Sequence, residues 1–444
     1  MPTTGAAPPR REWHAERWLS VLMAEQRAPE HVVVVGAGMV GLATAWFLQD
    51  EGVHVTVVDR EGVAAGSSWG NAGWLAPALT LPLPEPGILT MGMKAALSPS
   101  SPVYVPMTTN RQLLKFLTSF ARHCTPERWR AAMMVFIEAN ALSLDAFDAL
   151  AGGGLRESTT EADPFVAAFL SEDERQGLVE EFDHVAHVGG RTVHELVDGD
   201  ALRALEPALS DAVSHGVLLR GQRFINPGRY VHSLADAVRE RGGEVLDRVE
   251  VDAVRTAGGR VEVRPVSGDP IDADAAVIAS GTWLGRLARA HGVQTIVQAG
   301  RGYSFFVQLE QKPANPVYFP AQRVACTPIE RDDGVSGLRV AGMMEFRRPK
   351  APPDPRRIRA IVDAARPLLH GVDWESRTDE WVGSRPCTAD GLPLVGRSRT
   401  PGVYIAGGHG MWGIALGPLT GQLLAGQIVR GETTGLLERL DPLR

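Results

Sequence analysis

The sequence predicts an α/β fold in two parts: a doubly wound domain with a parallel sheet, and an α+β domain with a mixed or antiparallel sheet. A strand, glycine turn, helix and second strand follow one another over residues 32–60, and a similar strand, turn and helix begin at residue 403. Apolar residues alternate along parts of 300–350, which is typical of antiparallel strands. The chain of 444 residues exceeds the length at which one hydrophobic core stops growing, so we expect more than one domain.

The stretch VVVVGAGMVGLATAWFLQDEGVHVTVVDR carries the strongest signal. Residues 32–35 are valines, as in a strand buried on both faces, and three glycines then fit the G-x-G-x-x-G pattern: Gly36, Gly38 and Gly41. These glycines allow a tight turn, close approach of a pyrophosphate and packing of the helix at 39–49, whose N-terminus attracts phosphate. Asp59 ends the second strand, where a carboxylate binds a ribose 2′-hydroxyl. This order predicts a Rossmann-like domain that binds FAD or NAD rather than NADP; an ordinary glycine turn in an α/β core is the alternative.

The composition argues against several classes of function. The net charge of −7 and the lack of a basic block make a nucleic-acid partner unexpected. The three cysteines, Cys124, Cys326 and Cys387, are far apart, which predicts a reducing cytoplasm and neither a disulfide framework nor a metal site. No apolar run approaches the roughly 18 residues of a membrane span, and residues 1–30 lack the apolar region of a secretory signal.

Residues 1–30 form an N-terminal extension. Trp13, Trp18, Leu19 and Leu22 share one helical face, which predicts a short helix docked on the body of the protein. A helix on a membrane surface is the alternative, although nearby acids weaken it. The expected location is cytoplasmic, with peripheral contact at the inner face of the membrane left open.

The segments after Asp59 leave the first domain. Residues 66–73 (GSSWGNAG) form either a simple loop or one that passes close to a flat ring and hydrogen-bonds to it. The proline-rich residues 77–106 predict an ordered crossing loop. Apolar spacing predicts helix over 111–150, and then a further helix and short strands over 171–206.

The later segments return to the first domain. We predict strands at 217–219 and 244–254, a helix at 230–241, and a buried strand at 276–279 in the same sheet as residues 32–35. The antiparallel sheet within 300–350 should turn one face to a core and the other to a ligand. A helix near 356–369 and a final helix at 414–429 complete the prediction.

Five stretches match a known pattern: residues 32–60, Asn71-Ala-Gly73, Arg301-Gly-Tyr-Ser304, Arg385-Pro386 with Asp390-Gly391, and Gly408-His-Gly410. Together they resemble the D-amino-acid oxidase/dehydrogenase superfamily of FAD-dependent oxidoreductases, most of all its bacterial D-amino-acid dehydrogenases. The set is more specific to the superfamily than to one substrate. The resemblance implies an FAD-binding domain in three pieces, 31–80, 207–290 and 376–444, and a substrate domain made of 81–206 and 291–375.

By position, the resemblance also implies roles for individual residues. Asp59 would bind the adenosine ribose, residues 67–73 would line the flavin, and a helix beginning near Gly413 would stabilise negative charge on the reduced ring. The residues assigned to FAD are Gly36, Gly38, Met39, Val40, Gly41, Asp59, Arg60, Ser67, Ser68, Asn71, Ala72, Gly73, Val251, Ser280, Gly281, Trp283, Gly408, His409, Gly410, Met411, Trp412 and Gly413. We expect non-covalent FAD, because Cys387 does not match the cysteine that some relatives bond to it.

The implied reaction is oxidative deamination of a D-amino acid to the 2-oxo acid through the imino acid, by hydride transfer to flavin N5. Arg385 matches the arginine that holds the substrate carboxylate, and a guanidinium suits bidentate binding. Tyr303 is a second candidate catalytic residue, with a core aromatic residue as the alternative. His409 either contacts the flavin or shapes the glycine turn. The expected electron acceptor is a quinone, another carrier or O₂.

Other functions stay open at the level of sequence. Within the family, the substrate is alternatively a cyclic or N-alkyl secondary amino acid, such as a D-proline derivative, or glycine or sarcosine. Trp412 replaces the smaller residue expected in the dehydrogenases, which puts their broad substrate range in doubt for this chain. A nicotinamide-dependent dehydrogenase would leave Arg385 and residues 408–413 without a purpose. A non-catalytic flavoprotein or partner subunit is the remaining class.

Overall fold

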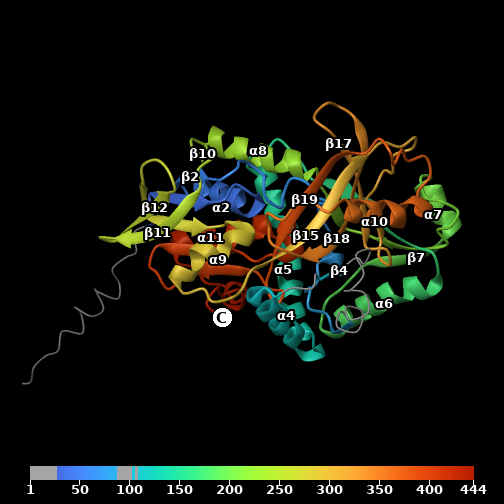
Figure 1. Ribbon diagram of the computed structural model, residues 1–444, viewed down its shortest axis with the longest axis horizontal. Coiled ribbons are helices and arrows are strands. Elements are labelled where there is room, and N and C mark those ends of the chain that lie inside the picture. The colour runs from blue at the N-terminus through green and yellow to red at the C-terminus, as the bar shows by residue number, and fades with distance from the viewer. Residues whose placement is uncertain (1–27, 88–102, 106–108) are drawn as a thin grey trace, which may run out of the picture.

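The computed structural model of the protein describes residues 28–87, 103–105 and 109–444. Figure 1 shows two parts side by side: a sheet flanked by helices on the left, and a larger sheet with β15, β18 and β17 on the right. The predicted helix near Trp13–Leu22 and most of the proline-rich crossing loop lie outside the described residues. The part of the chain that the structure describes holds no helix with both the length and the apolar character needed to cross a membrane.

The first sheet confirms the predicted doubly wound arrangement. Its order over the described residues is β10-β2-β1-β14-β21-β20, and all of its pairs are parallel except β20 with β21. The order runs outward from β1 in both directions, as in doubly wound folds. The strands span β1 His31–Val35, β2 His54–Val58, β10 Glu244–Leu246, β14 Ala275–Ile278, β20 Leu394–Arg397 and β21 Val403–Gly407.

Both faces of β1 are buried, as its four valines predict. Val32 and Val34 pack in the core on one side, whereas Val33 and Val35 pack in a second core on the other. Three helices cover the first side: α2 Met39–Asp50, α8 Pro227–Glu240 and α11 Gly417–Arg430. The second side is covered by α9 Leu284–Ala288 and by a small sheet of β11 Val251–Ala257, β12 Arg260–Pro265 and β13 Ile271–Ala273.

The second large sheet is mixed but mostly antiparallel, which confirms the predicted α+β part. Its order over the described residues is β19-β15-β18-β17-β16-β6-β8-β7, with β4 beside β18. The pairs β16–β6 and β18–β4 are parallel. The strands span β4 Val103–Tyr104, β6 Phe165–Phe169, β7 His194–Asp198, β8 His215–Leu219, β15 Gln298–Val307, β16 Val317–Phe319, β17 Val324–Glu330, β18 Ser336–Phe346 and β19 Thr378–Cys387.

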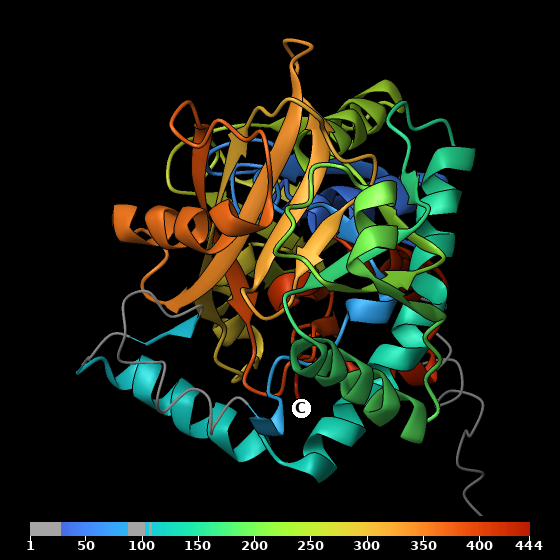
Figure 2. The ribbon, with the colours of Figure 1, turned by 90° about the vertical axis from the view of Figure 1, so that its right-hand side faces the viewer.

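The two faces of this sheet have different neighbours. One face packs its apolar side chains on α10 Pro355–Ala365. On the other face, the hydroxyls of Ser304 and Thr327 donate to the carbonyls of Gly70 and Ala72, at 2.7 and 2.6 Å. The loop that follows the first glycine motif therefore lies against this sheet. Figure 2 shows β15 and β18 crossing in front of the blue N-terminal segment, with α10 to one side.

The remaining elements lie around these sheets. The helical region predicted over 111–150 is two helices, because Thr125 caps a new helix that begins at Pro126. A third small sheet joins β3, β9 and β5. These elements span β3 Trp74–Leu75, α4 Arg111–His123, α5 Pro126–Gly152, β5 Thr160–Ala162, α6 Glu172–His187, α7 Gly199–Leu205, β9 Gln222–Phe224 and α12 Gly435–Arg439.

Two sequence predictions are corrected by the structure. The single strand predicted over 244–254 is two strands in different sheets, β10 and β11, and Arg248 between them has a left-handed backbone with φ of 61°. The last helix, α11, begins at Gly417 rather than near Gly413, because a 3₁₀ turn at Gly410–Trp412 comes first. The domain boundaries stay a prediction. Two strands from the segments assigned to the FAD-binding domain, β8 and β19, belong to the larger sheet, where β8 lies between β6 and β7 and β19 lies beside β15.

Candidate active site

A cavity of about 1180 Å³, part of it open to solvent, lies at the carboxyl ends of β1, β2, β14 and β21. Val35, Val58, Ala279 and Ala406 line it from the ends of these four strands or the residue after them. The sheet order reverses between β1 and β14, and ligands of doubly wound folds bind at such a switch point.

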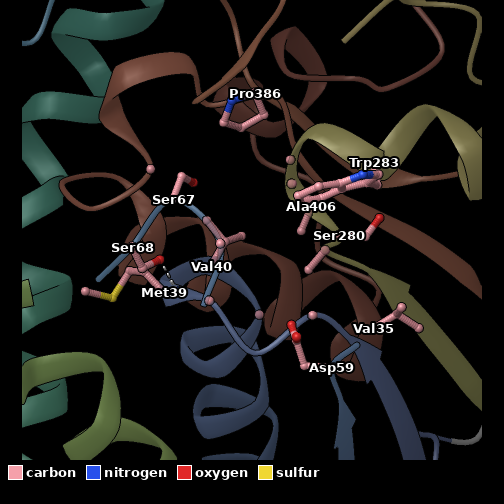
Figure 3. Close-up of a pocket in the computed structure, with 18 of the residues that line it drawn as sticks. Val35, Met39, Val40, Asp59, Ser67, Ser68, Ser280, Trp283, Pro386 and Ala406 are labelled. Atoms are coloured by element: carbon pink, nitrogen blue, oxygen red, sulfur yellow. Dashed lines mark hydrogen bonds between the residues drawn. The ribbon is translucent and has the colours of Figure 1, made fainter. Parts of the chain in front are cut away.

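The first glycine turn forms one wall of the cavity. Gly36 has φ of 125°, and a Cβ there would lie 2.4 Å from the carbonyl oxygen of Ala279. A Cβ on Gly41 would lie 1.9 Å from the carbonyl oxygen of Gly36, so α2 approaches the strand only because this residue is glycine. Gly38 caps α2 without a side chain, and the Met39 N–H is donated to the Ser68 hydroxyl at 3.2 Å (Figure 3).

Asp59 lies at the end of β2, as predicted, and its carboxylate organises the turn. One oxygen accepts the Ala37 N–H at 2.9 Å, and the other accepts the N–H groups of Glu61 and Gly62 at 2.8 and 3.0 Å. A carboxylate offers about four lone-pair positions, so capacity is left for a hydroxyl in the cavity. The carboxylate also joins the two strand ends that a ribose would span.

The opposite wall comes from the segment after β14. Ser280 and Trp283 face the cavity across from Ser67 and Ser68 (Figure 3). The Arg60 guanidinium lies over the Trp283 ring, 4.0 Å from its centre, which closes this end with a cation–π contact. Gly281 has φ of 56°, and a Cβ there would meet no protein atom within 4 Å.

The second glycine turn, at Gly408–Gly413, reaches the same cavity and carries a buried histidine. His409 is 1% exposed, and its Nε2 lies 2.8 Å from the Thr420 hydroxyl. Its Nδ1 is buried and has no hydrogen-bond partner among the residues that the structure describes. Burial lowers the pKa of His409 to about 4, so its ring is neutral at physiological pH. A β-bridge between His409 and Cys387 joins this turn to β19.

Arg385 reaches the cavity from β19, close to both turns. Its Nη1 donates to the carbonyl of Met343 at 2.9 Å. Burial lowers the pKa of the guanidinium below its ordinary value, and among the described residues no carboxylate pairs with it. A Cβ on Gly302 would lie 2.2 Å from Nη2, so the guanidinium lies flat over this glycine. Arg385 therefore presents a cation with donors to the cavity, and no carboxylate of the described residues pairs with it.

Most of the predicted site residues line this one cavity. They are Gly36, Gly38, Met39, Val40, Gly41, Asp59, Arg60, Ser67, Ser68, Asn71, Val251, Ser280, Gly281, Trp283, Arg385, His409, Gly410, Met411 and Gly413. The others lie outside its lining, namely Ala72, Gly73, Tyr303, Gly408 and Trp412.

The residues outside the lining have other contacts. Gly408 has φ of 73° and packs against Thr388 and Leu394. Trp412 donates its indole N–H to the Leu81 carbonyl at 2.7 Å, so it joins the second glycine turn to the start of the crossing segment. This contact gives no support to a role of Trp412 in limiting the substrate range.

Tyr303 is 1% exposed and lies on the α10 side of its sheet. Its hydroxyl donates to Glu345 Oε1 at 2.6 Å and accepts the Asp354 N–H at 3.2 Å. Burial, with the Glu345 hydrogen bond, raises its pKa to about 12. This placement favours the packing role that the sequence left as an alternative.

Sequence reasoning missed part of the cavity lining. Most of the missed residues are next to a predicted one, so widening each motif by one or two positions would have found them. The missed residues are Val35, Val58, Glu61, Ala65, Gly66, Glu250, Ala279, Arg286, Leu287, Pro386, Ala406, Gly407 and Ile414. Arg286 and Leu287 come three and four residues after Trp283. This is the spacing of one helical turn, so they could have been predicted to share a face with Trp283.

Comparison with known proteins now fixes the family. The DAO family model, described as FAD-dependent oxidoreductase, matches residues 31–427, which is most of the chain. The chain belongs to this family. Membership confirms the resemblance to the D-amino-acid oxidase/dehydrogenase superfamily and the prediction of an FAD-dependent oxidoreductase.

Individual DAO relatives support the same assignment. The chain is 29% identical over 396 residues to a D-amino acid dehydrogenase of Cereibacter sphaeroides, with 87% of this chain and 89% of the relative covered. Glycine oxidase from Bacillus cereus has a similar structure, with a TM-score of 0.67, 20% identity and coverage of 92% and 97%. L-alpha-glycerophosphate oxidase from Mycoplasma pneumoniae, solved with FAD bound, gives a TM-score of 0.68, 17% identity and coverage of 91% and 95%. These two structures show the DAO fold alone.

The residues of the cavity fit the FAD that the DAO family implies. Within the described part of the chain, three lining residues each have a buried polar atom that finds no partner there: Arg60 Nε, Ser280 Oγ and His409 Nδ1. Gly281 and Gly410 leave open space where a side chain would project. A bound molecule with hydrogen-bonding groups along its length would satisfy these atoms, whose burial is otherwise costly.

Proposed function

We propose that this enzyme oxidises the Cα–N bond of a D-amino acid, to give the 2-oxo acid through the imino acid, with non-covalent FAD. The observation that carries the proposal is Arg385, whose guanidinium shares one cavity with both glycine turns and pairs with no carboxylate of the described residues. An amino-acid carboxylate supplies the missing anion in bidentate geometry. The D-amino acid dehydrogenase relative, at 29% identity, supports the choice of substrate class.

In this proposal the protein binds and orients, and bound FAD supplies the two-electron oxidation through hydride acceptance at N5. The first glycine turn binds the pyrophosphate and Asp59 binds the adenosine ribose. Ser67, Ser68 and Asn71 would border the ring on one side, and His409, Gly410, Met411 and Gly413 would border it on the other. The neutral His409 offers a nitrogen to the cofactor rather than a positive charge.

Arg385 orients the substrate by holding its carboxylate, so that the Cα–H bond points at the ring. Fixing this geometry before reaction is worth far more than the ion pair itself, because the reacting atoms are then already in place. The described lining offers no group suited to be a general base near Arg385. His409 is neutral, but with a pKa of about 4 it is too weak a base to take a proton from the substrate amine. The substrate amine therefore enters neutral or loses its proton to solvent.

Non-covalent attachment of FAD is part of the proposal. Cys387 is 1% exposed, and burial raises its pKa to about 12, so the thiolate that would attack the ring does not form. Acid precipitation of the purified protein should leave all yellow colour in the supernatant. Flavin retained in the pellet would contradict this part.

Anaerobic reduction of the flavin tests the proposal directly. D enantiomers of a panel of amino acids should bleach the visible absorbance, and the L enantiomers should not. Arg385→Lys should raise the substrate concentration for half-maximal reduction by roughly tenfold or more, because a Lys cannot make the bidentate contact. Equal bleaching by L enantiomers would reject the stereochemical assignment, and unchanged behaviour of Arg385→Lys would reject the role of Arg385.

The same panel separates the alternative substrates and acceptors. Faster reduction by glycine, sarcosine or D-proline than by primary D-amino acids would assign a secondary or small amine instead. The reduced enzyme is then mixed with O₂ or with a soluble quinone, and the faster oxidant identifies the acceptor class.

A further inference from the structure

The Arg385 guanidinium lies at an irregularity in the sheet. Arg301 of β15 pairs with Glu345 of β18, but Tyr303 pairs with Gly342. Two residues of β18, Met343 and Met344, therefore lie opposite the single residue Gly302, which is a β-bulge. The Met343 carbonyl accepts the Arg385 hydrogen bond, and Gly302 is the residue over which the guanidinium lies.

The bulge has an unfavourable backbone conformation. Met343 has φ of 61°, a left-handed value that a bulky residue rarely adopts. Such conformations are unfavourable for a residue with a side chain and persist only where the surroundings enforce them. Contacts near Met343 must therefore stabilise the bulge, and these contacts also fix the orientation of the Met343 carbonyl.

Buried side chains on the opposite face of the sheet tie the two sides of the bulge together. Glu345 Oε1 lies 3.2 Å from Arg301 Nη1, on the register step before the bulge. The same oxygen accepts a hydrogen bond from the Tyr303 hydroxyl at 2.6 Å. Tyr303 belongs to the first residue pair after the bulge. Arg301, Tyr303 and Glu345 are each at most 1% exposed, so solvent does not compete with these bonds.

We propose that Glu345, Arg301 and Tyr303 position Arg385 by holding the bulge at Met343, so that the carbonyl of Met343 fixes the guanidinium in the cavity. This inference rests on the proposed function of Arg385 and deepens it. Tyr303 then affects carboxylate binding from behind the sheet without touching the substrate. The sequence identified Tyr303 as a candidate, and this network gives it a role that fits its burial.

Binding of benzoate, a carboxylate without an amine, tests the inference on the FAD-containing enzyme through the visible absorbance of the flavin. Tyr303→Phe removes only the hydroxyl, and we expect the dissociation constant for benzoate to rise roughly fivefold or more, since a buried bond to a charged group is lost. Glu345→Gln is the second variant, which keeps the shape of the side chain but removes its charge, and it should weaken benzoate at least as much.

A double-mutant cycle distinguishes positioning from general destabilisation. In the Arg385→Lys background, Tyr303→Phe should change the benzoate dissociation constant less than about twofold, because the group being positioned is gone. Tyr230→Phe is the matched control: Tyr230 is 1% exposed and lies on α8, away from the bulge. It should leave benzoate binding at the wild-type value.

The outcomes separate this inference from the proposed function. Unchanged benzoate binding in Arg385→Lys overturns the proposed function of Arg385. Weakened binding in Arg385→Lys with wild-type binding in both Tyr303→Phe and Glu345→Gln overturns the positioning role alone. An equal effect of Tyr303→Phe in both backgrounds also overturns it, because the hydroxyl would then act on stability rather than on Arg385.

Discussion

At the scale of single residues, Gly302 leaves the space that the Arg385 guanidinium occupies. A Cβ there would lie 2.2 Å from Nη2 and 2.3 Å from Cζ, so Gly302→Ala forces the guanidinium away from the Met343 carbonyl. We expect the KM for the amino acid to rise roughly tenfold, with a smaller change in kcat, because carboxylate binding is lost in ground and transition state alike. Steady-state kinetics with a saturating acceptor measures both.

Gly177→Ala provides a control for this change. Gly177 lies inside α6, where an added Cβ meets no atom within 4 Å. Its kinetics should match the wild type, and its helix should gain slightly in stability because alanine is the better helix former. A wild-type KM for Gly302→Ala would show that the Arg385 guanidinium can move without affecting substrate binding. That result would contradict the proposal that its position over Gly302 matters for binding the carboxylate.

His409 should make stability depend on pH in a defined window. Its pKa is about 4 in the folded protein and near 6.5 when unfolded, so the unfolded chain binds the proton more tightly. The folded state therefore loses stability as the pH falls from about 6.5 to about 4, by up to roughly 3 kcal/mol from this residue. His409→Asn should reduce that loss, as measured by denaturant unfolding at pH 7 and pH 5.

A second asparagine variant tests whether this effect comes from burial. His184 is exposed on α6, and His184→Asn makes the same exchange at that exposed position, so that any effect of the exchange itself on unfolding can be subtracted. The same pH dependence in His409→Asn as in the wild type would mean that His409 is not the group that titrates.

At the scale of elements, the close approach of the α11 and α2 backbones depends on Gly421. A Cβ on Gly421 would lie 2.7 Å from backbone atoms of Ala43 and Thr44. Gly421→Ala must push the two helices apart, and overpacking of this kind costs about 1–3 kcal/mol. We expect a lower midpoint of thermal unfolding and weaker FAD retention, because α2 carries the first glycine turn at its N-terminus.

Gly426 in the same helix is the matched control. The atoms nearest to its added Cβ are the flexible ends of Arg430 and Glu432, which can move. Gly426→Ala should therefore be neutral or raise stability by about 0.5–1 kcal/mol, through helix propensity alone. Equal unfolding midpoints for the two variants would contradict the close packing of α11 on α2.

The elements also show what the sequence could and could not predict. Periodicity and glycine spacing were sufficient for β1, α2, β2 and β21, because each is specified by local residues. The split of 244–254 into β10 and β11 depends on two different sheets, which no local pattern reports. The same holds for the bulge at Met343, since two residues oppose one only once β15 and β18 are paired.

The candidate site follows the same division. The glycine turns, Asp59 and Arg385 were predictable, since each belongs to a compact motif. The function of Tyr303 was not, because the side to which an alternating residue points depends on which face of the sheet meets the cavity. Tyr303 lies on the α10 face, whereas Ser304 beside it reaches the Gly70 carbonyl.

At the scale of the whole molecule, the cavity is lined by segments far apart in the chain, so its ligand should stabilise the fold. A molecule that binds only the folded state raises the free energy of unfolding by RT ln(1 + [L]/Kd). This is about 2.7 kcal/mol when its free concentration is one hundred times Kd. We expect removal of FAD to lower the midpoint of thermal unfolding, and added FAD to raise it with concentration. Adenosine diphosphate, which matches only the first turn, should give a smaller shift; a midpoint independent of FAD would contradict the assignment of the cavity.

The order of strands in the first sheet has a consequence for biosynthesis. β1 and β2 emerge early, but their neighbours are β10 and β14, and the wall that closes the cavity belongs to β21 and the turn after it, at residues 403–413. A nascent chain thus carries the first glycine turn well before the cavity behind it is complete. A complete cavity therefore requires residues 403–413 to have been made, and a ribosome that stops before residue 403 releases a chain that lacks one wall of the cavity.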